Sequence, residues 1–87
     1  MAWPGWPAAN EIFHDTVHRI ARVDWPLRKE MSRKLKILGD RKAVLQRREV
    51  DYRRNRKSPD EHLANLVGWY DDLQYLGNEI TWALLSQ

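Results

Sequence analysis

Hydrophobic residues recur at helical spacing over most of the chain, and residues 25–56 form the longest segment with this pattern. Its apolar positions predict one core-facing helix side: Leu27, Met31, Leu35, Leu38, Leu45 and Tyr52. Met31, Leu38, Leu45 and Tyr52 are spaced seven apart, which is typical of a coiled-coil seam. Gly39 interrupts the segment. It either ends one helix beside a cap at Asp40, or it is an internal glycine that costs about 1 kcal/mol. Because the seven-residue spacing continues across Gly39, we expect a continuous or slightly bent helix.

Residues 59–85 show the same periodicity and predict a second long helix. Ser58 is a favourable N-cap, Pro59 suits the first helical position, and Glu61 completes a capping box. The predicted core positions of this helix are Leu63, Leu66, Val67, Tyr70, Leu73, Ile80 and Leu84.

The N-terminal part predicts a shorter helix over residues 10–23, with Asn10 as N-cap and an apolar stripe of Phe13, Val17, Ile20 and Ala21. Residues 1–9 contain Trp3-Pro4 and Trp6-Pro7, and each proline disfavours helix at the residue before it. We therefore expect an extended Trp-Pro arm. Its tryptophans either close one end of the core or contact a partner.

A tight turn at residues 57–58 requires the two long helices to run antiparallel as a hairpin. Pairing outward from the turn predicts four levels: Tyr52 with Leu63, Leu45 with Tyr70, Leu38 with Gly77, and Met31 with Leu84. At the third level the glycine would let the helices approach closely. The predicted fold is all-α and a single domain of residues 1–87: an antiparallel two-helix hairpin, a shorter N-terminal helix packed across it as in a three-helix bundle, and the Trp-Pro arm.

Composition narrows the functional classes. The 87 residues include no cysteine, which excludes disulfides, thiolate zinc sites and a cysteine nucleophile. No apolar run is long enough to span a membrane, and Met1–Trp6 lacks the basic and apolar regions of a signal peptide. We expect a soluble cytoplasmic protein.

Catalytic and cofactor motifs are not apparent, so we expect a protein that is not an enzyme and has no cofactor. His14 and His18 have the i, i+4 spacing of two metal ligands, but the sequence lacks the H-E-x-x-H pattern. A third ligand would have to come from His62 or from an acid across the fold, and we predict no metal site. Asp71 and Asp72 are adjacent, which points their side chains about 100° apart on a helix rather than into one site.

Charge is distributed in blocks. The net charge is +3, but it is unevenly distributed. Residues 28–57 are strongly basic and hold 13 of the 15 lysines and arginines. Residues 58–87 hold five acids and no lysine or arginine. Part of this charge is expected to form ion pairs within the hairpin. A further set lies on the helix face opposite the core, and we name it the basic stripe: Lys29, Arg33, Lys36, Arg47 and Arg54.

Several apolar and aromatic residues lie off the predicted core faces. Tyr75 and Trp82 are seven residues apart on the acidic helix, and Ile37 and Val44 are seven apart on the basic helix. We expect the N-terminal helix to cover at least one of these pairs, leaving the other for a partner or for self-association. Candidate partner-binding residues are therefore the basic stripe with Tyr75, Trp82, Trp3 and Trp6.

The function we expect is a small protein-binding module, a regulator, inhibitor or accessory subunit of a larger complex, that meets an acidic protein surface. The alternative is nucleic-acid binding through the basic stripe, since phosphate contacts need charge but little exact geometry. A helix hairpin with a spare apolar face often dimerises, so a homodimer is a further expectation. The size and composition are also compatible with a phage- or mobile-element-encoded factor.

Overall fold

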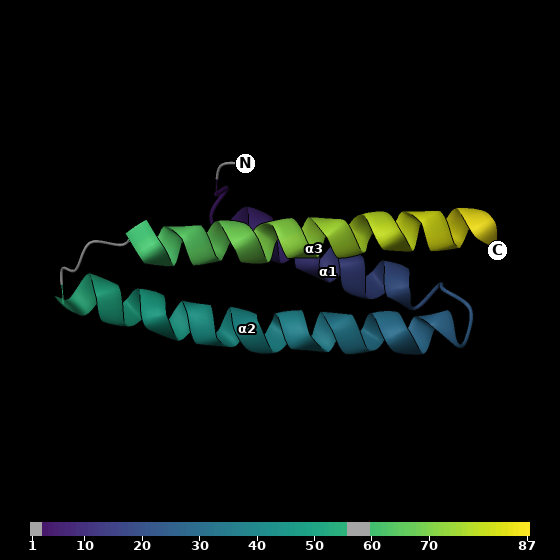
Figure 1. The fold of residues 1–87 in the computed structure, drawn as a ribbon, viewed down its shortest axis with the longest axis horizontal. Coiled ribbons are helices and arrows are strands. Elements are labelled where there is room, and N and C mark those ends of the chain that lie inside the picture. The colour runs from purple at the N-terminus through teal and green to yellow at the C-terminus, as the bar shows by residue number, and fades with distance from the viewer. Residues whose placement is uncertain (1–2, 56–59) are drawn as a thin grey trace.

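The computed structural model describes residues 3–55 and 60–87, and this part of the chain contains three α-helices and no strand. The prediction of an all-α protein is confirmed for these residues. The helices are α1 (Trp6–Ile20), α2 (Leu27–Asn55) and α3 (Asp60–Ser86). The long helices α2 and α3 lie side by side in opposite directions, and α1 packs behind the half of them near the α1–α2 connection (Figure 1). The molecule is elongated, with extents of 49 × 22 × 18 Å.

Helix α1 begins four residues before the predicted N-cap at Asn10, which lies inside the helix instead. Gly5 is the N-cap, with a φ of 93° that a residue with a side chain rarely adopts. Pro7 is in the first turn, where its missing N–H needs no partner, and the Ala9 N–H donates to the Gly5 carbonyl at 3.1 Å. The predicted arm of residues 1–9 is therefore wrong beyond Gly5, because the second Trp-Pro pair starts a helix. The same helix ends at Ile20 rather than at residue 23.

Helix α2 is continuous through Gly39, as expected. It starts at Leu27, two residues after the predicted start, and the Arg28 N–H donates to the Asp24 carbonyl at 3.0 Å just before it. A Cβ at Gly39 would lie 3.4 Å from Cζ of Phe13, so the missing side chain leaves room for the ring of Phe13 from α1. The predicted capping residues Ser58 and Pro59 lie outside the described residues.

Trp69 of α3 is the point at which the three helices meet. Its side chain is fully buried, and its indole Nε1–H donates to the Leu38 carbonyl of α2 at 2.8 Å. The ring of Phe13 stacks on it with centroids 6.4 Å apart, and the ring of Trp6 lies 5.5 Å away. One buried side chain thus contacts both other helices.

The predicted core faces are partly right. The buried residues that were predicted are Met31, Leu35, Leu38 and Leu45 on α2, and Leu66, Tyr70, Leu73 and Ile80 on α3. Leu27, Leu63 and Val17 are exposed instead. The unpredicted buried residues of α3 are His62, Trp69 and Leu76. Because α3 contacts α1 as well as α2, its buried arc is wider than a single seam.

The register of α2 against α3 is close to the predicted one and is not shifted by a heptad. The rings of Tyr52 and His62 lie 5.1 Å apart, and His62 directly precedes the predicted partner Leu63. The prediction for Gly77 is wrong. A Cβ at Gly77 would lie 3.8 Å from Nη1 of Arg19, so this glycine faces α1 rather than Leu38.

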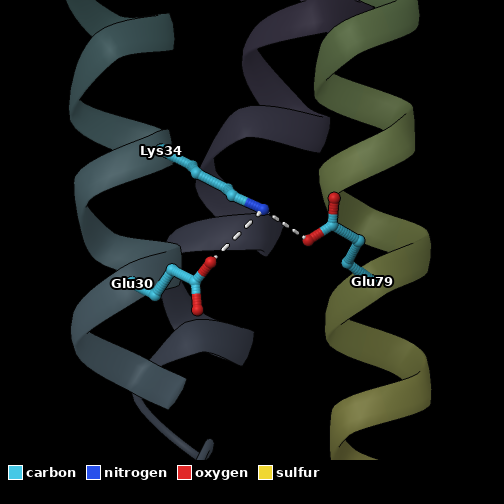
Figure 2. Close-up of polar contacts among 3 residues, drawn as sticks. All are labelled: Glu30, Lys34 and Glu79. Atoms are coloured by element: carbon cyan, nitrogen blue, oxygen red, sulfur yellow. Dashed lines mark hydrogen bonds and ion pairs between the residues drawn. The ribbon is translucent and has the colours of Figure 1, made fainter. Parts of the chain in front are cut away.

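Ion pairs join the basic helix to the acidic one, as expected for part of their charge. Lys34 Nζ lies 2.9 Å from Glu79 Oε2 across the helix pair and 3.9 Å from Glu30 Oε1 on its own helix (Figure 2). Arg41 Nη1 lies 2.7 Å from Asp72 Oδ2, about two turns further along the helix pair. The hydrogen bond to Glu79 raises the pKa of Lys34 above its usual 10.5, with smaller contributions from nearby charges.

Replacing Trp69 should destabilise the protein more than replacing any exposed residue. Trp69→Phe keeps most of the ring but removes the hydrogen bond to Leu38, so we expect a loss of about 1–2 kcal/mol in the free energy of unfolding. Trp69→Ala leaves a cavity and should cost roughly 3–5 kcal/mol. Urea denaturation followed by circular dichroism measures both, with the exposed Leu85→Ala as a control expected to stay within about 0.5 kcal/mol of wild type. Equal losses in Trp69→Ala and Leu85→Ala would contradict the central role of Trp69.

Lys34 should contribute stability that depends on pH. A pKa raised in the folded state means that the contribution is complete below 10.5 and is lost as the pH rises through the higher folded-state value. We therefore expect Lys34→Gln to unfold more easily than wild type at about pH 8, with the difference shrinking in stronger alkali. Denaturant titrations across this range measure it, and Lys36→Gln in the basic stripe is the control. A difference that stayed constant would mean that the lysine acts through packing rather than charge.

Candidate functional site

Four large apolar residues on α2 and α3 are left uncovered by α1. The exposed fractions are 54% for Ile37, 37% for Val44, 68% for Tyr75 and 71% for Trp82. The expectation that α1 covers one of these pairs is therefore wrong. Helix α1 packs on the other side of α2, where Gly39 receives Phe13, and residues two apart on a helix point in nearly opposite directions. The sequence showed that these residues were off the core but not on which side α1 would pack.

A groove lies between α2 and α3 on this uncovered side, and we call it the open groove. It holds about 280 Å³ and is lined by Lys34, Ile37, Leu38, Asp72, Tyr75, Leu76 and Glu79. Its floor and walls are apolar, while Lys34 with Glu79 and Arg41 with Asp72 form ion pairs between its two helices. An apolar floor with charged edges is the usual receptor for an amphipathic helix.

Two further hollows extend the open groove along the hairpin. One holds about 530 Å³, shares Glu79 with the groove, and brings Trp82 of α3 together with Trp25 and Leu27. Trp25 is 62% exposed, and the cationic groups of Arg28 and Lys29 lie 5.9 Å and 5.7 Å from its ring centroid. The other hollow holds about 360 Å³ and includes Arg41 and Val44. Sequence reasoning missed Trp25 because the Trp-Pro break was read only as a helix boundary.

The basic stripe is exposed along the outer side of α2. All five of its residues are exposed, and none forms an ion pair within residues 3–55 and 60–87. The cations that do form ion pairs there are Lys34, Arg41 and Arg53. The stripe therefore keeps its positive charge for solvent or for a partner, whereas the groove-side cations are partly neutralised.

Trp3 and Trp6 lie on the α1 side, away from the open groove. Both are half-buried and pack against the core, with their ring centroids 5.0 Å apart in a T-shaped arrangement. Trp3 also contacts Tyr70, with centroids 6.2 Å apart, and the Trp6 indole donates a hydrogen bond to Glu49. The two residues thus pack as a lid over the core. The structure places Tyr75 and Trp82 on the groove side of α3, whereas Trp3 and Trp6 pack on the α1 side.

Among residues 3–55 and 60–87, no group of three or more His, Cys, Asp or Glu is arranged to hold a metal ion. Over the same ranges, no helix has the length and apolar character needed to cross a lipid bilayer. His62 is buried, and neither of its ring nitrogens has a hydrogen-bond partner in the described part of the chain. It packs on Tyr52 and lies apart from the open groove.

Comparison with profiles of known protein families, with curated proteins and with solved structures found no match to this chain.

Proposed function

We propose that this chain is a small, non-enzymatic protein-binding module that acts as a regulator, an inhibitor or an accessory subunit of a larger complex. In this proposal the antiparallel hairpin of α2 and α3, with α1 packed across it, is a rigid support in a cytoplasmic protein. Its working surfaces are the open groove with its aromatic neighbours and the basic stripe. The observation that carries the proposal is that α1 leaves the groove side of the hairpin uncovered.

The exposed aromatic residues support protein docking. Trp82 and Tyr75 are each more than two-thirds exposed on the same side of α3. Tryptophan and tyrosine are enriched among the residues that dominate binding energy at protein interfaces. Large exposed apolar patches on small proteins commonly mark binding sites.

The basic stripe supports a partner with an acidic surface. Its cations run from Lys29 to Arg54 along one side of α2 and form no ion pair with the described residues. Such a surface accelerates association with a negatively charged partner and disfavours partners of like charge. The stripe lies on the outer side of α2 and the groove lies between α2 and α3, so a partner can contact the stripe whether or not the groove is occupied.

Affinity capture with matched variants tests this function. Tagged full-length wild type is compared with Trp82→Ala, with the charge reversal Arg33→Glu/Lys36→Glu, and with the controls Leu85→Ala and Arg22→Glu, which alter exposed residues outside both surfaces. The partner recovered with wild type should bind Trp82→Ala at least about tenfold more weakly, as expected for an interface anchor. The charge reversal should slow association and make it less sensitive to salt. Equal recovery with all five proteins would refute docking through these surfaces.

A second candidate function, nucleic-acid binding, is favoured by one observation, the five exposed cations of the basic stripe. If the stripe contacts several phosphates, the affinity for duplex or single-stranded DNA should fall steeply with salt, with a slope of roughly −0.7 to −0.9 per contact. Fluorescence anisotropy over a salt series measures the slope, and Arg33→Glu/Lys36→Glu should reduce it by about 2. Absence of binding at about 50 mM salt would leave the protein-binding function alone.

A further inference from the structure

We propose that the open groove binds a second copy of this chain, forming a two-fold symmetric dimer in which α2 of each copy packs against α3 of the other. This inference rests on the proposed function because it takes the open groove to be a docking surface. It goes further by naming a second copy of the chain as the molecule that binds there. The basic stripe lies on the outer side of α2 and stays accessible in such a dimer.

The groove side of each long helix carries its own seven-residue repeat. On α2 the repeat is Ile37 and Val44, and on α3 it is Gly68, Tyr75 and Trp82. All five residues are exposed, and the four other than Gly68 have large side chains. A second seam of this kind, parallel to the buried one, is what a helix in a larger bundle presents to its next neighbour.

Charge selects the orientation of the second copy. Helix α2 carries eleven lysines and arginines against four acids, whereas α3 carries five acids and no lysine or arginine. Two copies can bring their grooves together in two symmetric ways. A two-fold axis that runs across the helices places α2 of one copy on α2 of the other. A two-fold axis that runs along the helices places α2 of one copy on α3 of the other. The first stacks like charges and the second stacks opposite charges, so complementarity favours the axis along the helices.

This orientation also satisfies the ion pairs at the edges of the groove. A two-fold axis along the helices leaves the position of every residue along the helix direction unchanged. Lys34 of one copy therefore faces Glu79 of the other, and Glu79 faces Lys34. Each lysine then lies opposite a second carboxylate. The same holds for Arg41 and Asp72. Both ion pairs become alternating groups of four charges rather than groups of like charge.

Gly68 provides the steric fit. Arg41 is level with Asp72, and Val44 is one turn further along α2 while Gly68 is one turn back along α3. Val44 of one copy therefore faces Gly68 of the other. Apart from its chain neighbours and the nearby backbone of α3, no described atom lies within 4 Å of the position that a Cβ would take at Gly68, so the space above it is open in the single chain. By the same correspondence, Ile37 faces Tyr75.

Sedimentation equilibrium of the full chain over a micromolar to millimolar range tests the dimer. We expect wild type to approach twice the 10.4 kDa mass of one chain. Gly68→Arg fits the single chain without a clash and should stay at the mass of one chain. Its circular dichroism spectrum should equal that of wild type, and its unfolding midpoint should be no lower. Leu85→Arg, at an exposed position outside the groove, is the matched control and should behave as wild type.

Disulfide cross-linking tests the orientation directly, because the natural chain contains no cysteine. An oxidised mixture of Val44→Cys and Gly68→Cys chains should form a cross-linked pair that contains one chain of each kind, since these positions face each other. Val44→Cys alone should cross-link far less. Preferential cross-linking of Val44→Cys with itself would overturn the proposed orientation.

The outcomes separate this inference from the proposed function. A single-chain mass for wild type at every concentration overturns the dimer, and so does a Gly68→Arg variant that still dimerises. If wild type stays monomeric while Trp82→Ala loses an acidic partner, the groove accepts a helix of another protein and only the inference fails. If the dimer forms but no acidic partner depends on the basic stripe, the proposed regulatory function fails and the dimer stands.

Discussion

The burial of one indole ring, that of Trp69, is the interaction on which the arrangement of the three helices depends. Its buried N–H needs an acceptor away from water and finds it in the carbonyl of Leu38, a bond that restricts how far α3 can slide along α2. Phe13 stacks on the same ring because Gly39 leaves room for it. Helix α1 is thereby held on one side of the hairpin. The open groove on the other side is the direct consequence.

Local signals predicted the long helices well and the short one less well. The continuity of α2 through Gly39 followed from the unbroken seven-residue spacing. The start of α1 did not, because two signals competed: Asn10 is a good N-cap, but Pro7 is equally suited to a first turn once Gly5 supplies a positive φ. Which signal prevails depends on whether Trp6 can pack on the core, and that is a tertiary contact.

The candidate site was predictable in its parts but not in its arrangement. Seven-residue spacing singled out the apolar positions off the core, Ile37 and Tyr75 among them, and helical geometry placed the basic stripe on the outside of α2. The side on which α1 packs decides whether those positions are buried. That side is determined by the fit of Phe13 against Gly39 and Trp69, and periodicity along one helix carries no information about such a fit.

Helix α1 is about half as long as its neighbours, with 15 residues against 29 and 27. Its first turn reaches the level of Glu49, and beyond that level the hairpin is held by two-helix contacts such as that of Tyr52 with His62. Local opening should therefore cost much less free energy at this end than around Trp69. Amide hydrogens there are expected to exchange with solvent through local fraying, and those around Trp69 mainly through global unfolding. The protein thus consists of one cooperative folding unit with a less protected extension of the same two helices.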